Sequence, residues 1–283
     1  MPDMTQLSEH QRHIAAVYNV ASEGYDKPAL RFFSLVAQRL VDLVEMPAGG
    51  VVLDAATGTG TGAIAAARKV GPSGHVIGVD IAAHMLSKAQ QKVRNAGITN
   101  VTIQEGAIEG PEFGVDTFDA VLCASSISFL TDMSAALRGW QRVIRPGGWL
   151  AFSSYGKGAF EPMSGLYEAR IRSYGVPLPA PMPFSWQRLN DPEAASQLLR
   201  DAGLRNIRVY SEQLGYDLQT ANEWWDIVWN SGFRGPISQL PPAQLERFKS
   251  EHLAEVAAKF DTQSLRLHVP ANFALGQKAP AHS

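Results

Sequence analysis

The chain has 283 residues, of which 45% are hydrophobic and 18% charged, and its formal net charge is -2. This composition is typical of a globular protein with a substantial core, and the near-neutral charge excludes a general attraction to nucleic acids or anionic membranes. The single cysteine, Cys123, excludes intrachain disulfides and cysteine-based zinc sites, and we expect no metal.

Between about residues 45 and 155, short β-branched runs alternate with longer segments of helical periodicity. This alternation, with mostly apolar strands, predicts an α/β core: a doubly wound, largely parallel sheet with helices on both faces. The expected strands are 51–53, 76–79, 101–103, 120–123 and 149–153, and the expected helices are 63–70, 82–96 and 133–144.

Beyond residue 155 the alternation ends. A proline-rich stretch, 158–187, cannot be one regular element. Pro192 lies in the first turn of a predicted helix, which Asn190 or Asp191 caps and Gly203 ends. The other expected elements are helices at 220–231 and 241–260 and strands over RNIRVYSEQ and HVPANFALGQK.

The run VVLDAATGTGTG places three glycines at alternate positions after the first strand. Gly58, Gly60 and Gly62 form G-x-G-x-G, not the G-x-G-x-x-G of nicotinamide-binding folds, and the lysine of a P-loop is missing. Asp54 ends the strand before them. A carboxylate there would repel a pyrophosphate but suits a ligand that carries an ammonium or sulfonium group.

Asp80 ends the second strand, where a carboxylate can accept two hydrogen bonds from a ribose diol. Nicotinamide enzymes share this second acid, so Asp54 and the glycine spacing are the discriminating features. Each acid alone could cap a helix, and the glycines alone could form a tight turn. Together they predict a site for a cationic cofactor with a ribose.

Five segments in this order resemble the class I S-adenosylmethionine-dependent methyltransferases, in particular the UbiE/MenG-like small-molecule group. They are VVLDAATGTG, VIGVDIAAHML, IQEGAIE, DTFDAVLCASSISFL and RVIRPGGWLAFSS, with a weaker match at VYNVASEGYD. The resemblance implies a Rossmann-like methyltransferase fold with seven mostly parallel strands, an antiparallel last strand and helical lid additions. It also implies an N-terminal helical lid at 1–45, a cofactor-binding core at 46–156, and insertions plus the last two strands at 157–283.

The resemblance further implies which residues bind S-adenosylmethionine, which becomes S-adenosylhomocysteine. Asp54 would hold the methionine part and Asp80 the ribose. Ala107 stands where many relatives place an aspartate on the adenine amino group, so we expect the loss of one hydrogen bond of roughly 1 kcal/mol. The implied cofactor-binding residues are Tyr18, Tyr25, Asp54, Ala55, Ala56, Thr57, Gly58, Asp80, Ile81, Met85, Gly106, Ala107, Ile108, Cys123, Ala124 and Ser125.

Methyl transfer is an in-line displacement that depends on positioning, and it needs a base only when the nucleophile must lose a proton. His13 and Tyr18, both in the implied lid, are the candidates for a catalytic role. Aromatic side chains gather after residue 155 and either form an apolar substrate pocket or pack the additional helices onto the sheet. The expected substrate-pocket residues are Tyr155, Trp186, Trp225 and Trp229.

We therefore expect methyl transfer to an oxygen or carbon of a hydrophobic or aromatic small molecule, such as a quinone, phenol or polyketide. Two alternatives stay open: a protein of the same fold that binds the cofactor but catalyses a reaction such as a cyclisation, and a non-catalytic cofactor-binding protein. A nucleic-acid substrate is disfavoured, because CASS follows the fourth strand in place of a (D/N/S)-P-P-(Y/F/W) motif.

The sequence contains no apolar run near the roughly 18 residues that a membrane-spanning helix needs. Its first twenty residues are polar and lack the apolar stretch of a signal peptide. We expect a cytoplasmic protein with no integral membrane segment, and the sequence leaves the oligomeric state open.

Overall fold

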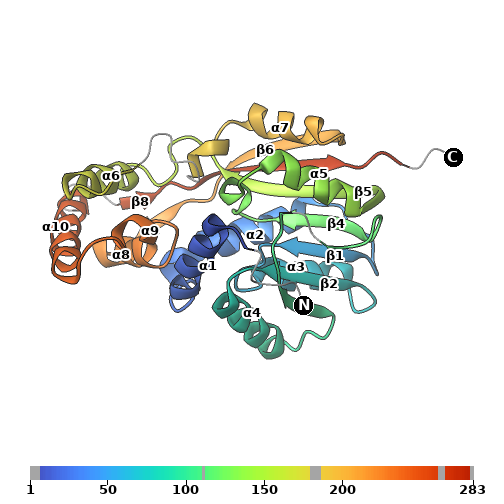
Figure 1. Cartoon of the computed structure of the whole chain (residues 1–283), viewed down its shortest axis with the longest axis horizontal. Coiled ribbons are helices and arrows are strands. Elements are labelled where there is room, and N and C mark those ends of the chain that lie inside the picture. The colour runs from blue at the N-terminus through green and yellow to red at the C-terminus, as the bar shows by residue number, and fades with distance from the viewer. Residues whose placement is uncertain (1–6, 110–111, 179–185, 261–264, 281–283) are drawn as a thin grey trace.

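A seven-stranded sheet crosses the middle of the molecule (Figure 1). The computed structural model describes residues 7–109, 112–178, 186–260 and 265–280. The strands of the sheet are β1 (Val51–Ala55), β2 (His75–Asp80), β3 (Val101–Glu105), β4 (Phe118–Cys123), β5 (Ile144–Tyr155), β6 (Arg205–Gln213) and β9 (Pro270–Gln277). Their order is β3-β2-β1-β4-β5-β9-β6. The pairs among β1 to β5 are parallel, and β9 is antiparallel to both β5 and β6. This confirms the predicted sheet with its antiparallel last strand.

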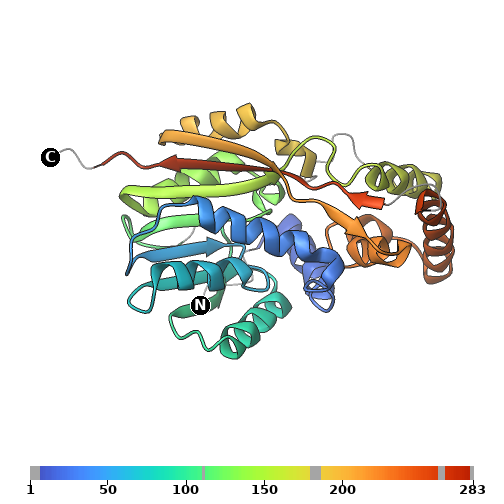
Figure 2. The same ribbon diagram turned by 180° about the vertical axis from the view of Figure 1, so that it is seen from behind.

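Helices cover both faces of this sheet. On one face, α2 (Arg31–Leu43) and α3 (Thr61–Val70) share a hydrophobic core with the strands, and Figure 2 shows both helices in front of the sheet. On the other face, α5 (Met133–Val143) and α7 (Pro192–Asp201) pack around the fully buried Trp140. Side-chain caps set the first turns of α5 and α7, as the capping signals at the start of α7 predict.

The N-terminal segment forms α1 (Glu9–Ala21), the 3-10 turn η2 (Pro28–Leu30) and then α2. A capping box begins α1: Ser8 Oγ accepts from the Gln11 N–H, and Gln11 Oε1 accepts from the Ser8 N–H. α1 lies beside α4 (Ala83–Asn95) at the end of the sheet (Figure 1). α2 instead belongs to the core on the sheet face, so α1 and the turn after it are the part that can cover a site.

A second hydrophobic core lies beyond the end of the sheet, at the left of Figure 1. Trp224 and Phe248 are fully buried in it. The segments predicted as helices at 220–231 and 241–260 are helical. The second core also contains a small sheet of two antiparallel strands, which are too short to show a periodicity in the sequence. The elements of this second core are α6 (Met163–Ser173), β7 (Tyr216–Leu218), α8 (Ala221–Trp229), α9 (Arg234–Ile237), α10 (Pro242–Phe260) and β8 (Leu265–Leu267). Two 3-10 turns lie elsewhere in the chain, η3 (Ile127–Phe129) and η4 (Trp186–Leu189).

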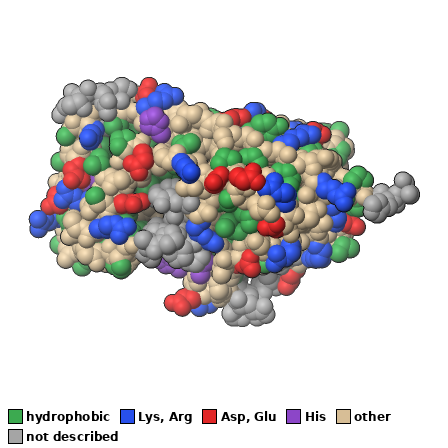
Figure 3. Space-filling view, turned by 90° about the horizontal axis from the view of Figure 1, so that it is seen from above, with side chains coloured by type: hydrophobic (Ala, Val, Ile, Leu, Met, Phe, Trp, Pro, Cys, Tyr) green, Lys and Arg blue, Asp and Glu red, His purple; other side chains and the backbone are tan. Residues whose placement is uncertain are grey.

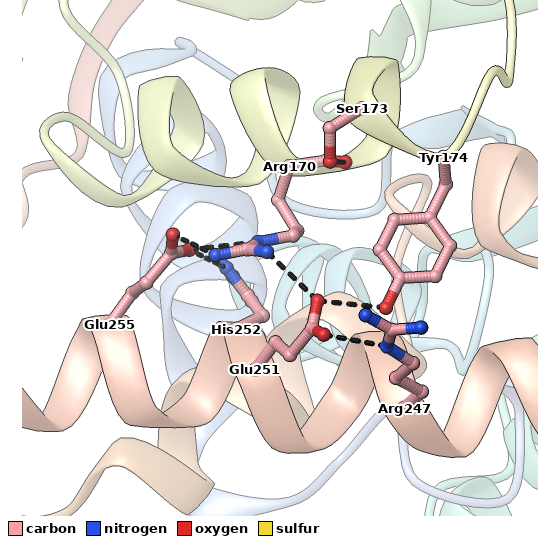
Figure 4. Close-up of polar contacts among 7 residues, drawn as sticks. All are labelled: Arg170, Ser173, Tyr174, Arg247, Glu251, His252 and Glu255. Atoms are coloured by element: carbon pink, nitrogen blue, oxygen red, sulfur yellow. Dashed lines mark hydrogen bonds and ion pairs between the residues drawn. The ribbon is translucent and has the colours of Figure 1, made fainter.

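A group of charged side chains joins α6 to α10 at the surface of this second core (Figure 4). Arg170 of α6 donates to Glu251 at 2.8 Å and also to Glu255, both of α10. His252 Nε2 accepts from the indole N–H of Trp224 at 2.8 Å. Burial lowers the pKa of His252 to about 4, so this histidine is neutral at physiological pH and stabilises the core without charge.

Among the described residues, no helix is both long enough and apolar enough to cross a membrane.

We predict that Gly276→Ala lowers the free energy of unfolding by about 1–3 kcal/mol, because the added methyl group overpacks the contact between β9 and the end of α7. It would lie 2.9 Å from Leu204 Cβ and 3.4 Å from Leu199 Cδ2. Gly235→Ala in α9 is the matched control, because the nearest atom to its added carbon is His13 Nε2 at 3.9 Å. Denaturant unfolding measures both, and a Gly276→Ala protein as stable as wild type contradicts this packing.

Candidate active site

The carboxyl ends of β1, β2 and β4 meet at a cavity of about 1080 Å³, a volume that includes its open mouth. The glycine loop and the acids at the strand ends form one wall, and α1, the turn after it and the first part of α2 form the other. The cavity therefore brings the strand ends of the sheet and the N-terminal helices together around one space.

Asp54 lies at the end of β1 with 2% of its surface exposed. Its Oδ2 accepts from the Thr57 hydroxyl at 2.6 Å, and the backbone N–H of Ala63 also donates to the carboxylate. Burial raises the pKa of Asp54 to about 6, and the charge of Asp80 adds to this shift. A Cβ on Gly62 would lie 2.9 Å from Asp54 Oδ2, so only glycine at this position leaves room for the carboxylate.

Asp80, at the end of β2, is held by backbone donors. Its Oδ2 accepts from the Gly58 N–H and its Oδ1 from the Ala82 N–H, both at 2.9 Å. Burial raises the pKa of this carboxyl group as well. The second acid is thereby tied to the glycine loop, and both acids border one cavity.

The backbone of the cavity wall is strained at two points. Ala56 and Ser125 have left-handed φ angles of 60° and 57° and both line the cavity. Such conformations are rare for residues with a side chain and cluster at functional sites. Gly58 has a φ of 53°, and nothing lies within 4 Å of the point where its Cβ would be. The loop thus leaves open space beside its backbone, as a closely bound ligand requires.

Polar contacts fix α1 over the cavity. Gln11 Nε2 donates to Glu109 Oε2 at 3.0 Å, and His10 Nε2 lies 2.9 Å from the carbonyl oxygen of Phe129. At the other end of the helix, Asn19 Oδ1 accepts from the His84 N–H at 2.9 Å, in the first turn of α4. These contacts connect α1 to the loops that follow β3 and β4 and to α4.

The turn after α1 completes this closure. Asp26 accepts from the Thr59 hydroxyl and from Lys92 Nζ, each at 2.9 Å, which joins the turn to the glycine loop and to α4. The ring of Tyr25 stacks on Phe33 with centroids 4.4 Å apart, and the Tyr18 ring meets Tyr25 edge-on at 6.2 Å. The turn therefore contributes both polar and aromatic contacts to the cavity wall.

The charge of the cavity is negative. Four acids line it, Asp26, Asp54, Asp80 and Glu109, while the described residues around it include no lysine or arginine. Lys92 lies close by but is paired with Asp26. Such a lining favours a ligand that carries a positive charge. The described residues also contain no group of three or more His, Cys, Asp or Glu that could hold a metal ion.

The structure brings most of the expected cofactor-binding residues to this cavity. Four do not line it. Ala55 and Cys123 point into the core under the sheet, because alternate side chains of a strand face opposite sides. Gly106 and Ala107, which follow β3, are not among the residues that line the cavity. Those that line it are Tyr18, Tyr25, Asp54, Ala56, Thr57, Gly58, Asp80, Ile81, Met85, Ile108, Ala124 and Ser125.

The catalytic candidate His13 is exposed and faces α9, away from the cavity. A helix turns about 100° per residue, so the face that carries His10, Ile14 and Tyr18 lines the cavity and His13 lies on another side. The helical spacing of residues 10, 14 and 18 is the signal in the sequence that could have selected His10 and Ile14.

Three of the four expected substrate-pocket residues do not line the cavity. Trp225 and Trp229 stack with centroids 5.9 Å apart in the second core, and Tyr155 is buried behind the cavity wall. The side chain of Trp186 lies outside the described part of the structure. The apolar wall is instead made by side chains that the sequence did not single out, namely Ile14, Phe33, Ala37, Phe129 and Leu130.

Comparison with known proteins identifies the family. Residues 47–174 match the model of a family described as "Methyltransferase domain". The ubiquinone/menaquinone biosynthesis C-methyltransferase UbiE of Cronobacter sakazakii is 32% identical over 209 residues, which is 70% of this chain and 82% of that protein. The chain belongs to the UbiE-like S-adenosylmethionine-dependent methyltransferases. As a member of this family it is an enzyme that uses S-adenosylmethionine as its cofactor.

Two further similarities extend over most of this chain. Nocamycin O-methyltransferase of Saccharothrix syringae is 26% identical over 272 residues, 91% of this chain and 95% of that protein. The crystal structure of the YcgJ protein of Bacillus subtilis is 20% identical, covers 87% of this chain and 99% of its own, and superposes with a TM-score of 0.56. The structural likeness shows the shared fold.

The residues of the cavity fit the cofactor of this family. Asp54 could accept the ammonium group, Asp80 could accept both ribose hydroxyls, and the open space beside Gly58 could receive the methionine part. Ile81 and Met85 could contact the adenine ring. Glu109 lines the cavity near the expected adenine end, but its Oε1 accepts from the Thr131 N–H and its Oε2 from Gln11.

We predict that Gly58→Ala weakens binding of S-adenosylhomocysteine by about a hundredfold or more, because the added methyl group enters the space a bound ligand needs. The matched control is Gly97→Ala. Gly97 has a φ of 63° and also has nothing within 4 Å, so it imposes the same backbone strain away from the cavity. Calorimetry should give the control wild-type affinity, and similar affinities of the two variants would place the ligand elsewhere.

We predict that the affinity for S-adenosylhomocysteine falls by up to about tenfold per pH unit below pH 6. The pKa of Asp54 is about 6, and protonation removes the charge that attracts the ligand ammonium group. Asp54→Asn should bind weakly at every pH and lose this dependence. Calorimetric titrations between pH 5 and 8 test the prediction, which a pH-independent wild-type affinity contradicts.

The same carboxyl group affects stability. Its folded pKa of about 6 lies above the ordinary value of 3.8, so its contribution to stability is fully present at low pH and is lost as the pH rises through about 6. Asp54→Asn should therefore stabilise the ligand-free protein at pH 7, by about 3 kcal/mol at most. Unfolding at pH 7 and pH 4 measures this, and a gain that is equal at both values of pH argues against the shifted pKa as its cause.

Proposed function

We propose that this methyltransferase transfers the methyl group of S-adenosylmethionine to an oxygen or carbon atom of a neutral, hydrophobic, aromatic small molecule. One observation carries the proposal: a single cavity joins the two strand-end acids to an aromatic and apolar wall, with no lysine or arginine among its described residues. The acids suit the cationic cofactor. The opposite wall, with Phe33 and Phe129, suits a flat apolar partner that needs no counter-charge.

The residues of the cavity act by binding, orientation and exclusion of water. When bound, the cofactor supplies an electrophilic methyl group. Burial raises the pKa of Tyr18 and Tyr25 far above the ordinary range, so these hydroxyls stay protonated and act as hydrogen-bond donors, not as bases. His10 Nε2 is engaged with the carbonyl of Phe129. A nucleophile that ionises readily, such as a phenol or the enol of a dicarbonyl, therefore suits this site best.

The relatives support the same range of substrates. UbiE is named for C-methylation in ubiquinone and menaquinone biosynthesis, and the nocamycin enzyme is named for O-methylation of nocamycin. We propose that this chain shares one of these two modes of transfer. On the face of the molecule shown in Figure 3, positive and negative side chains are mixed. Because a nucleic-acid site needs a concentration of positive charge, this face suits a small-molecule substrate better.

We predict that, with radiolabelled S-adenosylmethionine, a panel of neutral naphthols and hydroquinones is methylated at least tenfold faster than the same ring systems bearing a carboxylate. The acidic lining and apolar wall repel the second set. Scintillation counting with mass spectrometry of the products measures the rates. Preferential methylation of carboxylates or polar amines contradicts the proposal, and product formation without cofactor consumption supports the cyclisation alternative instead.

A further inference from the structure

Ser125 occupies a fixed point on the cavity wall, just beyond the end of β4. Its backbone N–H donates to the Ser153 hydroxyl on the neighbouring strand β5 at 2.8 Å. Its left-handed φ of 57° is a conformation that serine adopts at a cost. Ser125 also lines the cavity, so the strained backbone fixes a residue with a hydroxyl group at the cavity wall.

Tyr155 lies next to it, at the end of β5, and is only 7% exposed. Its ring packs edge-on against Phe32 and Phe160, with centroids 6.2 Å and 5.0 Å away. Within the described part of the chain its hydroxyl has no hydrogen-bond partner of normal geometry. Native proteins rarely bury such a group without a use, because an unpaired hydroxyl lowers stability.

The polar neighbours of this hydroxyl lie on the cavity side. Ser125 lies within hydrogen-bonding reach of the Tyr155 hydroxyl and opposes the effect of burial on its pKa, and Tyr18 and Tyr25 interact electrostatically with Tyr155. Burial is the main cause that raises the pKa of Tyr155, so the group keeps its proton and can donate. The buried Tyr155 hydroxyl, which makes no hydrogen bond of normal geometry, is therefore a neighbour of Ser125, a residue that lines the cavity.

We propose that Ser125 and Tyr155 form a donor pair that recognises a neutral oxygen, of a carbonyl or a phenol, beside the methyl-accepting atom of the substrate. In this arrangement Ser125 donates to the substrate oxygen, and Tyr155, as a positioning residue, donates to Ser125 Oγ. The inference rests on the proposed function and narrows its substrates to compounds with a second oxygen next to the nucleophile.

The test titrates 2-acetyl-1-naphthol and 1-naphthol, which differ by the carbonyl group beside the phenol, into protein saturated with S-adenosylhomocysteine. We expect wild type to bind the acetyl compound about tenfold more tightly, which corresponds to one well-made hydrogen bond. Tyr155→Phe should reduce this ratio to about two or less and keep its affinity for S-adenosylhomocysteine. Ser125→Ala should reduce the ratio as well.

Thermal unfolding separates this role from a structural one. Tyr155→Phe removes an unpaired buried hydroxyl and keeps the ring, so its Tm should rise by about 2 °C. The matched control is Tyr167→Phe, another buried tyrosine, whose hydroxyl donates to the Phe233 carbonyl at 2.6 Å outside the cavity. Its Tm should fall while the binding ratio stays at the wild-type value.

Three results overturn the inference: equal binding of the two naphthols by wild type, binding of neither, or a Tyr155→Phe ratio equal to that of wild type. In these cases intact binding of S-adenosylhomocysteine leaves the proposed function standing. Failure of wild type to bind S-adenosylhomocysteine overturns the proposed function and the inference together.

Discussion

Two carboxylates buried at the ends of adjacent parallel strands are the constraint on which the site depends. Asp54 and Asp80 are partnered only by a hydroxyl and backbone N–H groups, and no described cation of the protein faces them. Like charges removed from water are costly unless a ligand compensates them. The glycine loop is shaped by the same pair, since Gly62 leaves room for one acid and Gly58 donates to the other. A ligand with a cation and a diol supplies what the protein lacks.

The lid depends on the same strand ends. The first turn of α4 follows Asp80, and its own N-cap, Ala82, has no side chain that can cap a helix. Asn19 of α1 accepts the His84 N–H in its place. This hydrogen bond ties α1 to the segment that carries Ile81 and Met85, the residues expected at the adenine. The apolar wall opposite the acids joins three parts of the chain, because Ile14 comes from α1, Phe33 from α2 and Phe129 from the turn after β4.

The acids, the glycine loop and the sheet could be predicted from the sequence, because each is encoded by local signals: a strand that ends in an acid, glycines at fixed spacing, apolar runs between helices. The substrate wall could not. A cluster of aromatic residues in sequence does not reveal whether its members line a pocket or bury one another, and Trp225 and Trp229 do the latter. The sequence singled out His13 and not His10 for a related reason, since only the docked helix shows which of its faces meets the cavity.

If the two strand-end acids hold S-adenosylmethionine in the cavity, removal of one charged acceptor must weaken its binding. Calorimetric titration of S-adenosylmethionine and S-adenosylhomocysteine into wild type and Asp80→Asn tests this most directly, because the substitution keeps the shape of the side chain and removes the charged acceptor. We expect micromolar binding to wild type and affinity at least tenfold weaker in the variant. Equal affinities, or no binding to folded wild-type protein, would contradict it.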